Sequence, residues 1–444
     1  MRLALALLSA TLLNAAAPQL PEPYQSIASL AYAAPPEFAA DTLLRMVEFG
    51  KLADPGQRRD LIEQAFRLAS GTKFPVRLVG LPGTTADTRS GSLSKAYGLK
   101  LDALSLESRA VRDMLPLDPA KAREMFQEIA RPALPALTCD DALVYDVSDY
   151  YQALGAVVDS AFTRKERAKE EHLNFLLDFL GQAASPAQLL ALVPVVQGAG
   201  VTPQQRELLW ARFNGLLETL QPDDRSFSAS LGLFGAMSAP EMQVSLEKYR
   251  QRGHVCETDS APADRSRSTS QQQNTPSTPK LERYWQSAQA QTLFQAGQGL
   301  RFSSQRDLRS EADRATPQWQ QQLADYLGQL AGWTPDQEKS EADYYHQKCD
   351  VYQSVVELVP PGPEQDKLLE DYVAFISDSN LYQQSPAEWF LGPAALMERL
   401  QSDSQELRRV FAAFLASGNP VLALEARLRQ TIGAGLPSWI IGQK

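Results

Sequence analysis

Residues 185–220 read SPAQLLALVPVVQGAGVTPQQRELLWARFNGLLETL, and they contain two helix starts and two helical faces. Each half opens with Ser or Thr followed by Pro, an order that suits the N-cap and the first residue of a helix. Apolar residues then recur every three or four positions, which places them on one helix face. They are Leu189, Leu192, Val193 and Val196 in the first half, and Leu209, Phe213, Leu216 and Leu220 in the second. The stretch therefore predicts two amphipathic helices joined by a short turn.

The same pattern recurs along the chain. Six further pairs of a capping residue and proline precede segments with helical periodicity: Asp54-Pro55, Asp118-Pro119, Thr316-Pro317, Thr334-Pro335, Ser385-Pro386 and Asn419-Pro420. Residues 138–141, TCDD, resemble a capping box and predict one more helix start. Strand signals are nearly absent, and residues 76–79 are the one candidate. Amphipathic helices in series bury their apolar faces by stacking. We therefore predict an all-α fold of stacked antiparallel helical hairpins, as an α-solenoid or an irregular helical array.

Two segments interrupt the helical pattern. Residues 257–280 are rich in Ser, Thr, Gln and Pro and have almost no apolar content, which is typical of a disordered linker. This linker divides the chain into an N-terminal helical lobe, 18–256, and a C-terminal helical lobe, 281–444. Residues 71–98 are long for a connection between helices. Their apolar side chains favour an ordered loop that lies over the helices.

Residues 1–17 have the features of a signal peptide. Arg2 supplies a positive charge, residues 3–13 form an apolar run, and residues 15–17 are the small alanines that a signal peptidase needs. The run is shorter than the ~20 residues of a membrane-spanning helix, and no later segment could cross a membrane. We expect the mature chain to be soluble and periplasmic or secreted.

The formal net charge is -10 and the pI is about 5.1. An acidic chain repels nucleic-acid phosphates, so no nucleic-acid partner is predicted. The three cysteines are Cys139, Cys256 and Cys349. An odd number leaves at least one thiol unpaired in a monomer, and the sequence leaves open whether the other two form a disulfide. Cys349 shares an apolar face with Tyr345 and Tyr352, which predicts a core thiol.

Chemical motifs are sparse. The spacing of His346 and Cys349, and that of His254 and Cys256, could each place two metal ligands together, but neither HExxH nor CxxC occurs. Ser92 and Lys95 match an SxxK pattern without its partner motifs. No phosphate-binding glycine loop is present. We therefore predict no catalytic residue, no metal site and no cofactor.

Four cations form the best candidate for a binding site. They are Lys73, Arg77, Arg89 and Lys95, and the 71–98 segment that holds them contains a single acid, Asp87. An ordered basic loop could hold an acidic partner segment or an anionic glycan. The alternative is a surface loop whose cations pair with acidic helix faces.

Parts of the chain resemble a group of uncharacterised secreted bacterial helical-repeat proteins. The resemblance rests on residues 36–41 (PEFAAD), on residues 87–91 (DTRSG) and on the helices with Asp149-Tyr150-Tyr151 and Asp343-Tyr344-Tyr345. It covers about half of the chain and implies no activity. The chain is also weakly similar to α-solenoids of the tetratricopeptide or HEAT type, although their consensus motifs are missing.

Stacked helices offer long grooves that bind peptides or proteins by shape. The leading prediction is therefore a non-catalytic extracytoplasmic scaffold with a protein or peptide partner. The alternative is a carbohydrate-active hydrolase or lyase on an (α/α) toroid. That enzyme would need two carboxylates that converge in an aromatic-lined cleft. The oligomeric state stays open.

Overall fold

The structure is a computed structural model. It describes residues 20–80, 89–198, 200–227, 240–253, 288–302, 308–335, 340–356, 358–359, 362–400 and 404–433. Within these ranges the chain is almost entirely helical, so the all-α prediction is confirmed. The predicted signal peptide, 1–17, and the predicted linker, 257–280, lie outside the described residues.

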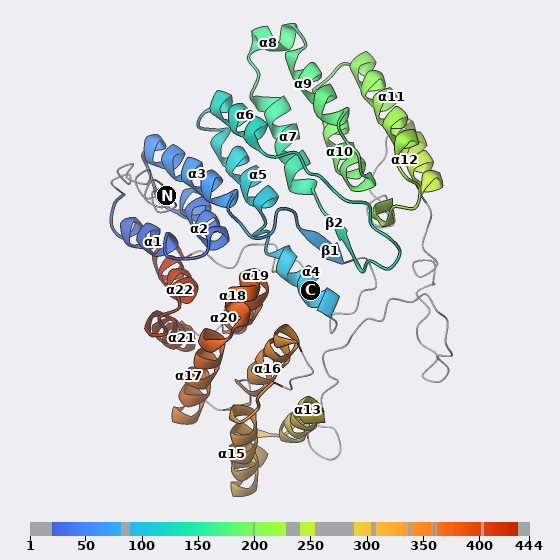
Figure 1. The fold of residues 1–444 in the computed structure, drawn as a ribbon. Helices are drawn as coiled ribbons and strands as arrows, with labels where there is room; N and C mark the ends of the chain where they lie inside the picture. Colours follow the sequence, from blue (N-terminus) through green and yellow to red (C-terminus); the bar gives the residue numbers. More distant parts are fainter. Residues whose placement is uncertain are drawn as a thin grey trace, which may run out of the picture.

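The helices up to residue 252 form an arc across the upper part of Figure 1. Along this arc α2, α3, α5, α7, α10, α11 and α12 each pack against the next. The helices of this part are α1 (Tyr24–Ala31), α2 (Pro36–Phe49), α3 (Pro55–Ala69), α4 (Arg89–Gly98), α5 (Ala103–Met114), α6 (Pro119–Glu128), α7 (Ser148–Ser160), α8 (Arg164–Ala168), α9 (Glu171–Leu180), α10 (Pro186–Gly198), α11 (Pro203–Thr219) and α12 (Pro240–Arg252).

The later helices lie below this arc, and α22 returns to pack against α1 and α2 (Figure 1). They are α13 (Ala288–Arg301), α14 (Glu311–Arg314), α15 (Pro317–Ala331), α16 (Glu341–Val356), α17 (Pro363–Asp378), α18 (Leu381–Gln384), α19 (Pro386–Trp389), α20 (Leu391–Arg399), α21 (Ser404–Ala416) and α22 (Pro420–Ile432). A single cluster of buried apolar residues extends from Leu20 to Leu428. The division into two lobes stays a prediction. None of the helices described is long and apolar enough to span a membrane.

Proline marks the helix starts as the sequence predicts. Seven of the eight predicted pairs begin a helix at the proline, and the exception is Thr334-Pro335, because α16 begins only at Glu341. The capping oxygens satisfy backbone N–H groups that have no partner inside the helix. Six side chains accept such a bond: Asp54, Asp118, Ser185, Thr202, Thr316 and Asn419.

The helix start predicted at residues 138–141 is wrong. The backbone N–H and hydroxyl of Thr138 do donate to Asp141 Oδ2, at 2.7 and 3.0 Å. The chain then enters strand β2 (Leu143–Tyr145), which pairs antiparallel with β1 (Leu78–Gly80). The residues of β2 are Leu, Val and Tyr, and the last two favour a strand that can pair. The capping-box pattern therefore closes a turn here.

The ordered loop predicted over residues 71–98 is wrong for part of its length. It contains β1, within two residues of the strand candidate at 76–79, and helix α4. The α4 sequence, RSGSLSKAYG, is rich in Ser and Gly, which are weak helix formers. The helix packs against β1 and α19, with Ser92 and Ala96 buried. Tertiary packing therefore outweighs the low helix propensity of this segment.

Candidate functional site

The four cations predicted to form a binding site have different surroundings. Lys73 donates from Nζ to the main-chain carbonyl of Gln384 in α18, so it links the segment after α3 to the C-terminal helices. Lys95 is exposed in the last turn of α4. Arg89 is the first residue of α4, and its side chain lies outside the described residues. Of these three side chains the structure describes Lys73 and Lys95, and Lys73 is engaged with the main chain of α18.

Arg77 is buried and faces acids of the N-terminal helices. Its Nη2 lies 2.6 Å from Asp146 Oδ2 and 3.1 Å from Asp149 Oδ2. Burial alone would raise the pKa of Asp149, but the guanidinium of Arg77 and the ammonium of Lys100 lower it below its ordinary value. The side chain of Arg77 is 7% exposed. It therefore stabilises the start of α7 and is not available to an outside partner in this conformation.

A groove with a volume of about 710 Å³ lies between α17 and α21. We call it the α17–α21 groove. Most of its walls are apolar or small side chains, and no aromatic residue lines it. The lining residues are Asp366, Leu369, Glu370, Val373, Ala374, Ser377 and Asp378 of α17, and Arg409, Val410, Ala412, Ala413, Ala416 and Ser417 of α21 and the residue after it.

Acidic side chains stand at the rim of the α17–α21 groove. Asp366 pairs with Arg409 across the groove, Oδ1 to Nη1, at 2.5 Å. Glu370 and Asp378 are exposed on α17, and neither forms an ion pair with any residue described. They are eight residues apart on one helix, which corresponds to roughly 12 Å along its axis. The groove thus combines an apolar floor with two negative charges.

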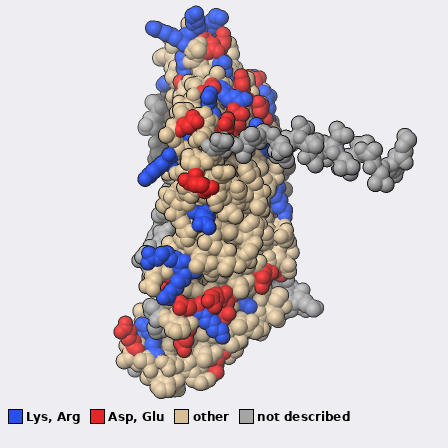
Figure 2. Space-filling view, turned by 90° about the vertical axis from the view of Figure 1, so that its left-hand side faces the viewer, with Lys and Arg blue, Asp and Glu red and all other residues tan. Residues whose placement is uncertain are grey.

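The face that lies on the left in Figure 1 carries fewer charged side chains in its middle than at its ends. Figure 2 shows this face, with Lys, Arg, Asp and Glu concentrated toward its upper and lower ends. The middle lies at the height of α1, α21 and α22 in Figure 1. α21 accordingly presents small side chains to the surface, with Ala412 and Ala416 exposed.

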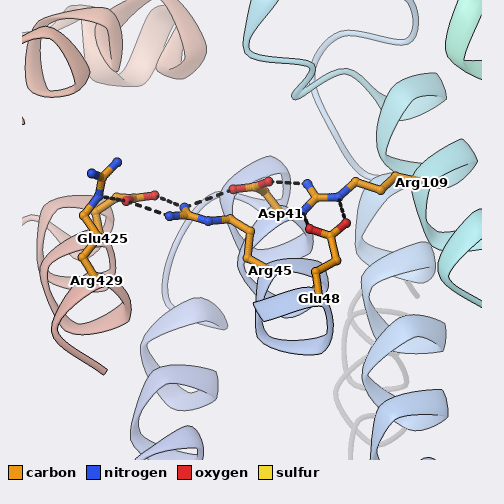
Figure 3. Close-up of polar contacts among 6 residues, drawn as sticks. All are labelled: Asp41, Arg45, Glu48, Arg109, Glu425 and Arg429. Carbon is orange, nitrogen blue, oxygen red and sulfur yellow. Dashed lines mark hydrogen bonds and ion pairs between the residues drawn. The ribbon is translucent and has the colours of Figure 1, made fainter. Parts of the chain in front are cut away.

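A network of ion pairs links α22, the neighbour of α21, to α2 and, through Asp41 of α2, to α5 (Figure 3). Arg45 Nη1 of α2 lies 2.5 Å from Glu425 Oε1 of α22, and Arg429 Nε lies 3.0 Å from Glu425 Oε2. On the other side, Arg109 of α5 lies 2.6 Å from Asp41 and binds both oxygens of Glu48. The network therefore connects α2 and α5, which lie near the start of the sequence, with α22, which lies near its end.

The charges of this network are strongly coupled. Burial alone would raise the pKa of Glu425, but the guanidinium groups of Arg45 and Arg429 lower it to about 2. Glu425 is therefore ionised throughout the physiological pH range. Because α22 packs against α21, the network also positions one wall of the α17–α21 groove.

The pKa values of two acids of α5 are shifted in the opposite direction, upward. Burial, with a further contribution from Asp102, raises the pKa of Glu107 to about 7. Burial, with repulsion from Glu48, raises the pKa of Asp113 to about 7. Neither residue lines the α17–α21 groove. Their protonation therefore bears on the stability of the fold rather than on chemistry in the groove.

The cysteines differ from one another. Cys139 is disulfide-bonded, whereas Cys349 is a free thiol. Cys349 is 2% exposed, so the prediction of a core thiol is confirmed. Within the ranges that the structure covers, no group of three or more His, Cys, Asp or Glu residues could hold a metal ion.

Sequence reasoning did not find the α17–α21 groove. A signal was present in residues 412–417, AAFLAS, because the three alanines and the serine share one helix face and leave little side-chain volume on it. The residues that complete the groove come from α17, and the sequence alone does not pair these helices.

Comparisons with protein-family models, with curated proteins and with solved structures found no match to this chain.

Proposed function

We propose that this chain is a non-catalytic interaction scaffold that binds a protein or peptide partner in the α17–α21 groove. The proposal rests on one observation, the open groove of about 710 Å³ with mostly apolar and small lining side chains. Small side chains let another backbone approach closely. Burial of apolar side chains against an apolar floor is favourable by about 25 cal/mol of free energy per Å² of apolar surface. A groove between two helices can accept an amphipathic helix or an extended peptide.

The charges at the rim favour a cationic partner. Glu370 and Asp378 are exposed and stand roughly 12 Å apart along α17. A partner helix with Lys or Arg at positions seven or eight residues apart would match that spacing. Paired charges at a rim contribute little affinity, but they select the partner and increase the association rate. We therefore expect apolar anchor residues with flanking basic residues.

The place of action is part of the proposal. The predicted signal peptide at residues 1–17 supports a periplasmic or secreted scaffold. Fractionation of cells that produce the full chain, followed by N-terminal sequencing of the mature protein, tests this point. Retention of residues 1–17 on a cytoplasmic protein would contradict it.

The groove is tested by selecting peptides from a random display library on the purified protein. We expect the selected peptides to share apolar residues with basic residues seven or eight positions apart. Ala374→Trp and Ala413→Trp should each abolish binding, because the indole would fill the groove. Ala211→Trp is the matched control, since Ala211 is an exposed alanine on the distant helix α11. Peptides that bind all three variants equally would show that the groove is not the site.

The carbohydrate-active enzyme stays the alternative. The α17–α21 groove has carboxylates but no aromatic lining residue, and Asp366 is already paired with Arg409. A glycoside hydrolase would need a free pair of carboxylates across the substrate. Hydrolysis of a polysaccharide panel that is lost in Glu370→Gln and Asp378→Asn would favour the enzyme over the scaffold.

A further inference from the structure

The α17–α21 groove has two ends that differ from each other. Asp366 and Arg409 stand near the starts of their helices and pair across the groove at 2.5 Å. Gln365 and Glu406, which also lie near these starts, line a second cavity together. From there the lining residues of the groove continue to the last residue of α17 and to the residue after α21. The two helices therefore begin at the same end of the groove and run in the same direction.

The charge also changes from one end of the groove to the other. Helices that run in the same direction present the positive ends of their peptide dipoles at their starts and the negative ends at their C-termini. The side chains follow this direction, because no Lys or Arg occurs after Lys367 in α17 or after Arg409 in α21. Asp378, the last residue of α17, is exposed and forms no ion pair with any residue described. The end at Asp378 is therefore negative, whereas Arg409 neutralises Asp366 at the other end.

The floor of the groove has few hydrogen-bonding groups for a ligand. Its two hydroxyl groups donate to carbonyls of their own helices, Ser377 to that of Val373 at 2.7 Å and Ser417 to that of Phe414 at 2.8 Å. The remaining uncharged lining residues are Ala, Val and Leu. An extended peptide on this floor would leave N–H and C=O groups without partners, which is costly. A helix satisfies these groups internally, so the groove favours a helical ligand.

We propose that the occupant of the α17–α21 groove is an α-helix that lies antiparallel to α17 and α21 and carries basic residues in its N-terminal half. This inference rests on the scaffold function proposed above, to which it adds the form and the direction of the partner. The positive N-terminus of the partner helix then lies at Asp378, and its negative C-terminus lies toward Arg409. One basic residue pairs with Asp378, and a second, roughly seven or eight positions later, pairs with Glu370. An acidic residue about four positions further on faces Arg409.

The direction is tested by photo-crosslinking a synthetic amphipathic peptide of this pattern, about 18 residues long, to the full chain. A benzophenone group is placed on either the first or the last residue of the peptide, and mass spectrometry identifies the residues that it labels. We expect the N-terminal label near Asp378 and Ser417, and the C-terminal label near Asp366 and Arg409. The opposite assignment, or both labels at both ends, would overturn the antiparallel direction.

A double-mutant cycle tests the pairing of charges. Asp378→Asn should weaken binding of the peptide about two- to five-fold, because an exposed ion pair contributes that much. This loss should disappear when the first lysine of the peptide is replaced by glutamine, and it should persist when the second lysine is replaced. Coupling of Asp378 to the second lysine instead would show that the helix lies in the opposite direction. Asp371→Asn is the matched control and should bind as the wild type does, since Asp371 is exposed on α17 but does not line the groove.

The helical form has its own test, and its failure differs from failure of the scaffold function. Replacing a central alanine of the peptide by proline should abolish binding, because proline breaks a helix but is compatible with an extended chain. A proline peptide that still binds in the groove would overturn the helical form and leave the groove as a binding site. Crosslinks outside the groove, or undiminished binding to Ala413→Trp, would instead contradict the scaffold function at this groove. Absence of binding to the wild-type chain would contradict both.

Discussion

Arg45 and Glu425 form a buried ion pair that joins α2, near the start of the chain, to α22, near its end. Their Nη1 and Oε1 atoms are 2.5 Å apart although the residues are 380 positions apart in sequence. Removing two charges from water costs several kcal/mol for each ion. Asp41 and Arg429 provide each member with a second partner, which helps to offset that cost. The pair therefore specifies how α22 docks on the N-terminal helices.

Glu425→Gln should destabilise the protein by ~3–5 kcal/mol, because it leaves the buried Arg45 and Arg429 without their carboxylate. Urea unfolding followed by circular dichroism measures the change. Asp366→Asn is the matched control, since Asp366 forms an ion pair with Arg409 in which both side chains are about 40% exposed. The control substitution should lower the free energy of unfolding by less than about 1 kcal/mol. Equal losses in the two variants would contradict a special role for the buried pair.

Glu107 should make the protein less stable as the pH rises from about 4 to about 7. Burial raises the pKa of Glu107 to about 7 in the folded chain, whereas the unfolded chain loses this proton near ~4.3. The folded state therefore binds more protons in this window, and its stability falls with increasing pH. Glu107→Gln removes that loss. Near neutral to alkaline pH the variant should exceed the wild type by ~1–3 kcal/mol, and near pH 4 the two should be similar.

Urea unfolding of Glu107→Gln and of the wild type across this pH range tests the prediction. Glu207→Gln on α11 is the control, because Glu207 is exposed and should leave the pH dependence unchanged. Parallel stability curves for Glu107→Gln and the wild type would contradict a raised pKa at Glu107.

Cys349 should resist alkylation in the native protein and react only after unfolding. The thiolate is the reactive form, and burial raises the pKa of the Cys349 thiol well above its ordinary value. Cys139 is disulfide-bonded, and the one other cysteine of the chain is Cys256, which lies outside the described residues. Mass spectrometry of unreduced peptides should therefore find Cys139 joined to Cys256. Native labelling of Cys349 at the rate of a free peptide thiol would contradict its burial.

The helical class and most helix starts could be predicted from the sequence, because both are local. A capping oxygen followed by proline acts within one turn, as Asp54 and Thr202 show by bonding to nearby backbone N–H groups. The same logic failed at Thr138, where the capping-box bonds form but the following residues pair with a distant strand. Helix α4 was missed for the related reason that its stability comes from packing rather than from propensity.

The candidate sites could be predicted only in part, because they depend on which helices meet. The net positive charge of residues 71–98 drew attention to Arg77 as a candidate binding residue. Its acidic partners Asp146 and Asp149 are about 70 residues away in sequence, and their ion pairs with Arg77 give it a structural role in the protein interior. The α17–α21 groove combines residues from two separate helices. No spacing along the chain encodes that pairing.

Gly392, at the start of α20, should not tolerate a side chain. A Cβ atom there would lie 2.5 Å from the Tyr345 hydroxyl and 2.8 Å from Cys349 Sγ. Tyr345 is fully buried and donates to the Trp389 carbonyl at 2.6 Å, so it cannot move aside without losing that bond. Gly392→Ala should therefore destabilise the protein by ~1–3 kcal/mol. Gly328 in α15 has no neighbour within 4 Å of such an atom, so Gly328→Ala should stabilise by ~0.5–1 kcal/mol. Urea unfolding of both variants tests the contrast, and a stabilising Gly392→Ala would show that α16 and α20 do not pack this closely.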